Sequence, residues 1–273
     1  MKRLLPLLGV AAVAATLAAC GGGGGSNGTT STSAASNVPN PIVFCSDTTY
    51  PPMESIVNGS AAGADVDIAN AVAKQLGSTA QIKTTGFDVI IPALLHKKCD
   101  AIISSMTITP ERSKSVHFTP YITVGAFLMV KKGNPENITT LASLSGKSAA
   151  VESSTTELAG LQAENKVLQK QGKAPITIKS YPADTNAAAA ILSGHVSAYF
   201  ADATPVLYYI GKTKGKFETA GKQIETAPEG IATRKGDPLG PKINNAVQAL
   251  YLNGKMTKIL AKWQASQFAL KNQ

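Results

Sequence analysis

Residues 104–112 (Ser-Ser-Met-Thr-Ile-Thr-Pro-Glu-Arg) hold the side chains with the clearest potential for ligand chemistry. The segment brings several hydroxyl groups together with one arginine, Arg112, at the predicted start of a helix. Thr109 suits the N-cap of that helix and Pro110 suits its first turn. Free N–H groups at a helix start attract anions, and a guanidinium can hold a carboxylate through two parallel hydrogen bonds. The segment therefore predicts a binding site for a small carboxylate.

Arginine is rare in this chain, which singles out that position. The sequence has 26 lysines and arginines in total, and only Arg3, Arg112 and Arg234 are arginines. The formal net charge is +9, and it becomes +7 once Lys2 and Arg3 are removed. The basic residues are spread along the chain without a dense block. The composition therefore indicates a solvated basic surface and argues against nucleic-acid binding.

The sequence shows no signature of a metal or cofactor site. Its histidines, His96, His117 and His195, are scattered without metal-ligand spacing. No phosphate loop, zinc motif or nucleophile elbow is present. We therefore expect no metal and no cofactor, and we expect the histidines at the surface or in loops.

The N-terminal residues predict export. Lys2 and Arg3 precede an apolar run over residues 4–19, which is too short for a comfortable membrane span and leads into Cys20. We expect residues 1–19 to be a signal peptide. The sequence Leu-Ala-Ala-Cys resembles the bacterial lipobox, whose cysteine is lipidated. The alternative is an ordinary cleavable signal with an incidental cysteine.

Residues 20–40 predict a lipidated, flexible tether. They are rich in Gly, Ser, Thr and Ala and cannot bury enough apolar surface to offset the entropy of ordering them. No later segment is long and apolar enough to span a bilayer. We therefore expect contact with a membrane only through the lipid anchor, and location in the periplasm or cell envelope.

Cys45 and Cys99 would remain as an even pair of cysteines in an oxidising compartment, so a disulfide is one prediction. The alternative is two free thiols. Cys45 lies late in one predicted strand and Cys99 at the start of another, and neighbouring parallel strands could hold their Cα atoms more than ~7 Å apart. The sequence leaves both possibilities open.

Apolar strands alternate with amphipathic helices along the chain. The first unit is predicted as strands 42–46, 80–84 and 101–105 with helices 65–76 and 87–96. The second is predicted as strands 125–130, 147–151, 176–181 and 196–201 with helices 155–171 and 186–192, followed by strand 226–233 and helices 243–252 and 256–268. This order is typical of the α/β class and predicts two doubly wound lobes. Polar residues at three strand ends (Asp47, Ser104 and Asp202) would meet in a cleft between the lobes.

An ordered set of motifs resembles the polar amino-acid-binding lipoproteins of ABC importers, which are type II periplasmic binding proteins (bacterial extracellular solute-binding proteins, family 3). The resemblance runs from about residue 42 to residue 263 and is carried by residues 47–54, 63–67, 87–94, 99–104, 107–112, 193–198, 202 and 254–263. Thr-Ile-Thr-Pro-Glu-Arg at 107–112 is the most specific match. Two positions depart from the family pattern: Ala64 replaces an aromatic residue, and Ser-Ser-Thr-Thr at 153–156 replaces a Gly-Thr pair.

The resemblance implies two α/β lobes joined by two crossing strands. Residues 41–124 plus 232–273 would form lobe 1, and residues 125–231 would form lobe 2 with hinge strands at its ends. A free amino acid would bind between the lobes, with Arg112 clamping its α-carboxylate and Asp202 accepting from its α-ammonium. Ser105 and Thr107 would add hydrogen bonds to the carboxylate or the α-amine, and Thr156, with Thr155 beside it, would contact the carboxylate from lobe 2. Tyr50 and Phe87 would sandwich the side chain, and Asp47 and Ser104 would lie toward its polar end.

These observations predict a monomeric, exported solute-binding protein that delivers a polar, cationic amino acid to the membrane subunits of an ABC importer. Arginine, lysine, ornithine, histidine and glutamine stay open as ligands, with the cationic ones first. The alternative is an exported dehydratase acting on a cyclic carboxylate such as prephenate, with Glu152 or Glu54 as general acid. Asp202, a partner for an ammonium group, favours the binding protein. A role in reporting ligand to a membrane receptor also fits the sequence.

Overall fold

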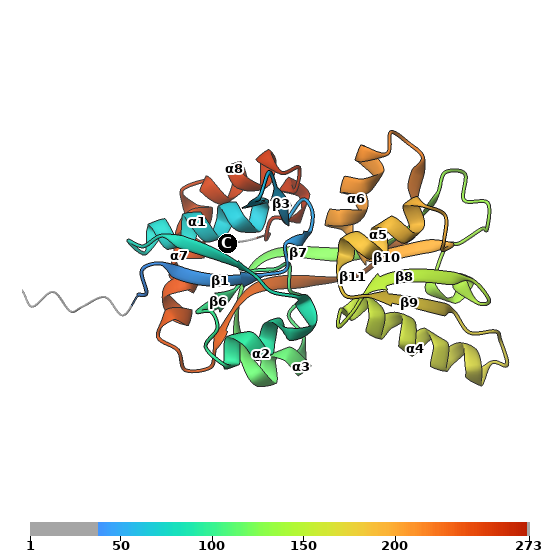
Figure 1. Ribbon diagram of the computed structural model, residues 1–273, viewed down its shortest axis with the longest axis horizontal. Coiled ribbons are helices and arrows are strands. Elements are labelled where there is room, and N and C mark those ends of the chain that lie inside the picture. Colours follow the sequence, from blue (N-terminus) through green and yellow to red (C-terminus); the bar gives the residue numbers. More distant parts are fainter. Residues whose placement is uncertain (1–37, 272–273) are drawn as a thin grey trace, which may run out of the picture. The chain divides into compact units, whose positions relative to one another are not determined.

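The computed structural model describes residues 38–271, which are built around an eight-stranded mixed sheet (Figure 1). Its strand order is β5-β1-β6-β11-β7-β10-β8-β9. In that order the strands are Ala80–Thr84, Ile42–Ser46, Ala101–Ile102, Phe217–Arg234, Val116–Lys131, Ala198–Asp202, Ser148–Glu152 and Thr177–Tyr181. A smaller sheet contains β2 (Thr49–Tyr50), β3 (Glu54–Val57) and β4 (Ser60–Ala62).

Two long antiparallel strands, β7 and β11, join two groups of shorter strands. They contain 16 and 18 residues, and they pair with each other along most of their length. β1 pairs in parallel with β5 and β6 in what we call lobe 1, and β8 pairs in parallel with β9 and β10 in lobe 2. The predicted class, two α/β lobes joined by two crossing strands, is confirmed. The predicted lobe boundaries at 124/125 and 231/232 fall inside β7 and β11, and that exact division stays a prediction.

Helices cover both faces of the sheet in each lobe (Figure 1). Lobe 1 has α1 (Ala64–Gln75), α2 (Ile90–Leu95), α3 (Pro110–Ser115), α7 (Leu239–Leu252) and α8 (Lys255–Lys262), and lobe 2 has α4 (Thr156–Lys170), α5 (Asp184–Leu192) and α6 (Ala203–Lys212). In α1, Ala69, Val72 and Ala73 are spaced as one helical face, and all three are fully buried in the core shared with α7 and α8. In lobe 2, α4 packs on one face of the sheet while α5 and α6 pack on the other.

Some elements differ in extent or type from those predicted. The strand predicted over 101–105 stops at Ile102, and it could not have reached residue 105, because Ser105 adopts a left-handed φ of 39° that no regular strand contains. The helix predicted over 87–96 begins instead as a 3₁₀ turn, Phe87–Val89, before α2. The helix predicted over 256–268 ends at Lys262, and a separate 3₁₀ turn follows at Ser266–Phe268.

A disulfide joins Cys45, in β1, to Cys99, which lies just before β6 in the chain; β6 is the strand next to β1 in the sheet. The Cα atoms are 5.7 Å apart, within the range that a disulfide can bridge. Neighbouring parallel strands do not keep these Cα atoms apart, because Cys99 lies before β6 rather than inside it. The three histidines are exposed.

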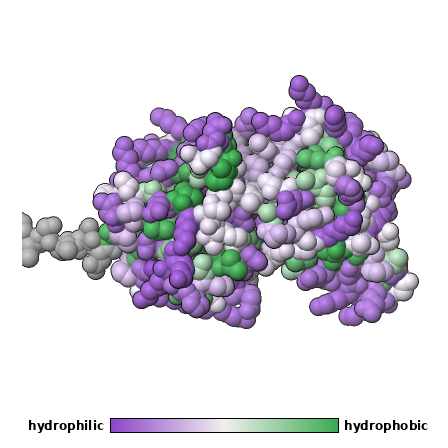
Figure 2. All heavy atoms as spheres, viewed as in Figure 1, coloured by the Kyte–Doolittle hydropathy of each residue, from purple (hydrophilic) through white to green (hydrophobic). Residues whose placement is uncertain are grey.

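The predicted signal peptide (1–19), the predicted lipidation site Cys20 and the predicted tether up to residue 37 lie outside the described residues. Across 38–271, no helix is both long enough and apolar enough to cross a membrane. The face in Figure 2 is mainly hydrophilic, with smaller apolar areas on both lobes.

Candidate ligand-binding site

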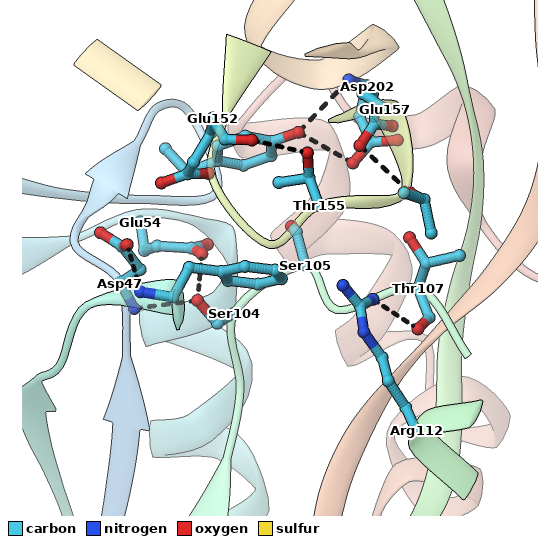
Figure 3. A pocket seen from close by; sticks show the side chains of 13 residues that line it. Asp47, Glu54, Ser104, Ser105, Thr107, Arg112, Glu152, Thr155, Glu157 and Asp202 are labelled. Carbon is cyan, nitrogen blue, oxygen red and sulfur yellow. Dashed lines mark hydrogen bonds between the residues drawn. The ribbon is translucent and has the colours of Figure 1, made fainter. Parts of the chain in front are cut away.

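A pocket between the two lobes contains every ligand-binding residue predicted from the sequence (Figure 3). The predicted residues are Asp47, Tyr50, Phe87, Ser104, Ser105, Thr107, Arg112, Thr155, Thr156 and Asp202. Three glutamates complete the lining: Glu54, Glu152 and Glu157. The sequence had indicated Glu54 and Glu152 only as possible acids of an enzyme, and it had not indicated Glu157.

The lobe 1 side of the pocket is built on a turn after β6 that is fixed by buried carboxylates. Ser104 Oγ accepts a hydrogen bond from Asp47 N–H (2.8 Å) and donates one to Glu54 Oε1 (2.9 Å). Ser105 N–H donates to Asp65 Oδ2 at 2.8 Å. Asp65, in the first turn of α1, also accepts from the Tyr121 hydroxyl at 2.8 Å. These bonds stabilise the left-handed backbone that presents both serines to the pocket.

Arg112 lies in α3 and has hydrogen-bonding capacity left for a ligand. Thr109 caps the helix by accepting from Arg112 N–H at 3.1 Å. The guanidinium donates from Nη1 to Thr107 O (2.8 Å) and from Nη2 to Ser154 O (3.1 Å). No acidic side chain among the described residues lies within ion-pair distance of it. Burial lowers the pKa of Arg112, and an incoming carboxylate would supply the missing counter-charge.

Arg112 also lies over an aromatic ring. Its Cζ is 5.2 Å from the centroid of Phe87, within the range of a cation–π contact. Phe87 N–H in turn donates to Asp47 Oδ2 at 2.8 Å. Phe87 therefore connects the basic end of the pocket with Asp47.

The lobe 2 side is formed by the ends of β8 and β10 and the start of α4. Thr155 is the N-cap of α4, where it accepts from Leu158 N–H (3.2 Å), and its hydroxyl donates to Glu152 O (2.8 Å). Thr156 Oγ1 donates to Glu157 Oε2 at 3.1 Å. Asp202 is the last residue of β10 and is buried. The start of α4 thus contributes two threonines to the pocket and places Glu157 close to Asp202.

Hydrogen bonds join the two lobes in and beside the pocket. The Tyr50 hydroxyl donates to Asp202 Oδ2 at 2.8 Å, a contact not predicted from the sequence, where Tyr50 was expected to contribute only its ring. Asp184 N–H donates to Thr49 Oγ1 at 3.1 Å. Together with the bond from Arg112 to Ser154 O, these contacts hold the lobes against each other.

Charge is distributed unevenly along the pocket. In Figure 3, Arg112 lies on the same side of the pocket as Asp202 and Glu157, whose charges act on it, whereas Asp47, Glu54 and Glu152 lie on the other side. Five carboxyl groups and one guanidinium line this space. The excess of carboxyl groups over basic groups makes their ionised forms unfavourable, because buried carboxylates lose hydration without gaining enough counter-charge.

The pKa values of the pocket carboxyls reflect this imbalance. Burial, with Asp184 and Asp47 adding to it, raises the pKa of Glu152 to about 10. Burial, then the charge of Asp202, raises the pKa of Glu157 to about 8. Burial also raises the pKa of Asp202 and, well above its ordinary value, that of Glu54. At neutral pH the pocket therefore retains protons that a cationic ligand could replace.

Residues 38–271 contain no group of three or more His, Cys, Asp or Glu side chains arranged to hold a metal ion. The arrangement instead defines a two-lobed binding protein with a pocket for a small polar ligand. Its half-buried arginine and its carboxyl groups suit a molecule that carries both signs of charge.

Comparison with known proteins gives the family. The description "Bacterial extracellular solute-binding proteins, family 3" matches residues 42–266. The chain belongs to this family. A curated relative, "ABC transporter arginine-binding protein 1" of Escherichia coli (strain K12), is 35% identical over 231 residues, which cover 81% of this chain and 90% of the relative.

Solved structures agree in fold. An ancestral arginine-binding protein has been solved bound to arginine (34% identity, TM-score 0.76) and bound to glutamine (34%, 0.75), in each case covering 83% of this chain and 99% of that one. The ancestral amino acid-binding protein AncCDT-1, described as a precursor of cyclohexadienyl dehydratase, is 33% identical with a TM-score of 0.73, covering 82% and 95%. The predicted relation to type II periplasmic binding proteins is confirmed.

Proposed function

We propose that the protein captures a cationic L-amino acid between its lobes and passes it to an ABC importer. The observation that carries the proposal is the charge order of the pocket: a guanidinium without a carboxylate partner at one end, and three gathered carboxyl groups at the other. An amino acid with a positively charged side chain presents the complementary order of carboxylate, ammonium and second cation. The names of the arginine-binding relatives support this proposal.

The proposed contacts follow the two ends of the ligand. Arg112 clamps the α-carboxylate, and Asp202 accepts from the α-ammonium. The hydroxyl groups of Ser105, Thr107, Thr155 and Thr156 add neutral hydrogen bonds around the carboxylate. Tyr50 and Phe87 enclose the aliphatic part of the side chain, and Asp47 and Ser104 lie toward its polar end.

Delivery would depend on closure of the lobes. Ligand contacts from both lobes can form together only in the closed form, so ligand shifts the population toward it. The importer would then recognise the closed lobes, with the protein exported as a monomer and held to the membrane by lipid at Cys20. Reporting ligand to a membrane receptor would use the same closed form.

A thermal-shift screen of the purified full chain tests this proposal. The ligands are the proteinogenic amino acids, ornithine and prephenate. A ligand present at about 100 times its Kd should stabilise the protein by about 2.7 kcal/mol. We expect the largest shift with arginine, lysine or ornithine, and the absence of a shift with every amino acid would contradict the proposal.

A dehydratase is the second candidate, because Glu152 would carry a proton at neutral pH, as a general acid must. The similarity to AncCDT-1, described as a precursor of cyclohexadienyl dehydratase, supports this second candidate. Against it, Asp202 and Glu157 near the carboxylate clamp suit an ammonium group, which prephenate lacks. We therefore propose no enzymatic activity. Conversion of prephenate by the purified protein, above the rate without protein, would reverse that choice.

A further inference from the structure

We propose that Glu152 is a specificity-determining residue of this pocket. Glu152 and Asp47 form a pair of facing carboxyl groups, one from each lobe. The pair binds the positive end of the ligand side chain and disfavours neutral ligands of the same shape. The inference rests on the proposed function. It goes further because it makes one residue of lobe 2 responsible for the preference for a cationic ligand side chain over an uncharged one.

The position of Glu152 points to a ligand rather than to a structural role. It is the last residue of β8, lines the pocket and is 4% exposed. Its Oε1 atom has no hydrogen-bond partner among the described residues. Burial of an oxygen without a hydrogen-bond partner costs free energy. This oxygen can therefore accept a hydrogen bond from a donor group of a ligand.

The groups around Glu152 do not provide that donor as a cation. Asp47 faces it from lobe 1 and Asp184 from α5, and both are acids that raise its pKa after burial does. Tyr199 and Tyr209 lie near enough to feel its charge. No lysine or arginine in the described part of the chain forms an ion pair with it. A positive group of a ligand would supply the counter-charge that the surrounding acids do not.

Asp47 is in place to share that positive group. Its Oδ2 already accepts from Phe87 N–H at 2.8 Å, so the carboxylate is fixed in orientation. Asp47 belongs to lobe 1 and Glu152 to lobe 2, so the two come together only when the lobes meet. A guanidinium or ammonium between them would replace the proton that Glu152 carries at neutral pH and would join the lobes, whereas a neutral amide or ureido group would leave two acids facing each other.

Arginine and citrulline test the inference, because citrulline replaces the guanidinium by an uncharged ureido group of nearly the same shape. Calorimetry gives the Kd of both ligands for the full-length wild type, Glu152→Gln and Glu157→Gln. The wild type should prefer arginine, and Glu152→Gln should reduce that preference by roughly ten- to a hundredfold. Glu157→Gln is the matched control: it lies beside Asp202, at the end common to both ligands, so it should change both Kd values by a similar factor.

The outcomes separate this inference from the proposed function. An unchanged arginine-to-citrulline ratio in Glu152→Gln would overturn the role of Glu152 while leaving amino-acid binding intact, and so would a wild type that binds both ligands equally. A wild type that binds neither them nor any other amino acid would overturn both. Should Glu152→Gln fail to show a thermal unfolding transition, Asp47→Asn tests the same pair from lobe 1, with the same loss of preference expected.

Discussion

At the scale of single residues, the two arginines of the described chain have opposite environments. Arg234 is satisfied internally: it pairs with Asp237 at 2.7 Å and donates to the carbonyls of Leu94 and Cys99. Arg112 has only two carbonyl partners and no acidic one. The same side chain is therefore structural in one place and available for a ligand in the other.

Replacing Arg112 by alanine should weaken binding of the amino acid by about 2–5 kcal/mol, because the ligand carboxylate would be buried without its charge partner. Calorimetry on the variant measures this loss. Arg234→Ala is the control, since it should lower the free energy of unfolding without changing the Kd. Equal affinities for wild type and Arg112→Ala would contradict the carboxylate clamp.

The pocket residues that lie at strand ends or within family motifs were predicted from the sequence, but Glu157 was not. A glutamate in the first turn of a helix is ordinarily read as a solvated charge that favours the helix dipole. Only the folding of β10 beside α4 brings it next to Asp202 and buries it. Its burial depends on tertiary packing, which no local spacing encodes.

At the scale of elements, the turn after β6 decides how the lobe 1 side of the pocket is presented. The apolar run over 101–105 predicted a longer strand, and the difference arises at Ser105. Its N–H is held by Asp65 of α1, 40 residues away in sequence, so the turn depends on a long-range hydrogen bond rather than on local propensity. Most of the strand and helix order was predictable, but α6, the small sheet β2–β4 and this turn were not.

Replacement of Asp65 by alanine should destabilise the protein by about 1–3 kcal/mol or more, because Ser105 N–H and the Tyr121 hydroxyl would both lose a buried acceptor. Urea denaturation measures the change. Tyr121→Phe removes only one of these bonds and should cost less. A stability of Asp65→Ala equal to that of wild type would show that the carboxylate does not hold the turn.

The disulfide is a second element-scale constraint, because it ties β1 to the turn before β6. Its cysteines are 54 residues apart, and the loss of chain entropy in the unfolded state predicts a stabilisation of about 4 kcal/mol. The double substitution Cys45→Ala and Cys99→Ala should lower the free energy of unfolding by about that amount. Peptide mapping without reductant that finds both thiols free in the wild type would contradict the bond.

At the scale of the whole molecule, buried acids should make stability depend on pH. Raised pKa values are about 10 for Glu152, about 8 for Glu157, about 8 for Asp184 and about 6 for Asp65. The folded protein binds these protons more tightly than the unfolded chain, whose carboxyl pKa values are near 4. The stabilisation is therefore fully present below about pH 4 and is lost as the pH rises through these folded-state values.

We therefore expect the melting temperature of the ligand-free protein to fall between about pH 5 and pH 8.5. A cationic ligand replaces protons in the pocket, so saturating ligand should reduce that fall. Differential scanning calorimetry across the pH series checks both statements. A melting temperature that rises steadily over this range without ligand would contradict the protonated pocket.

The proposed function requires that one pocket between the lobes holds one cationic amino acid. Calorimetric titration of the wild-type protein with arginine tests it most directly, with alanine, which lacks the second charge, titrated in parallel. The charge order of the pocket predicts saturable binding of one arginine per chain and much weaker binding of alanine. Equal binding of the two amino acids, or no binding of arginine, lysine and ornithine, would contradict it.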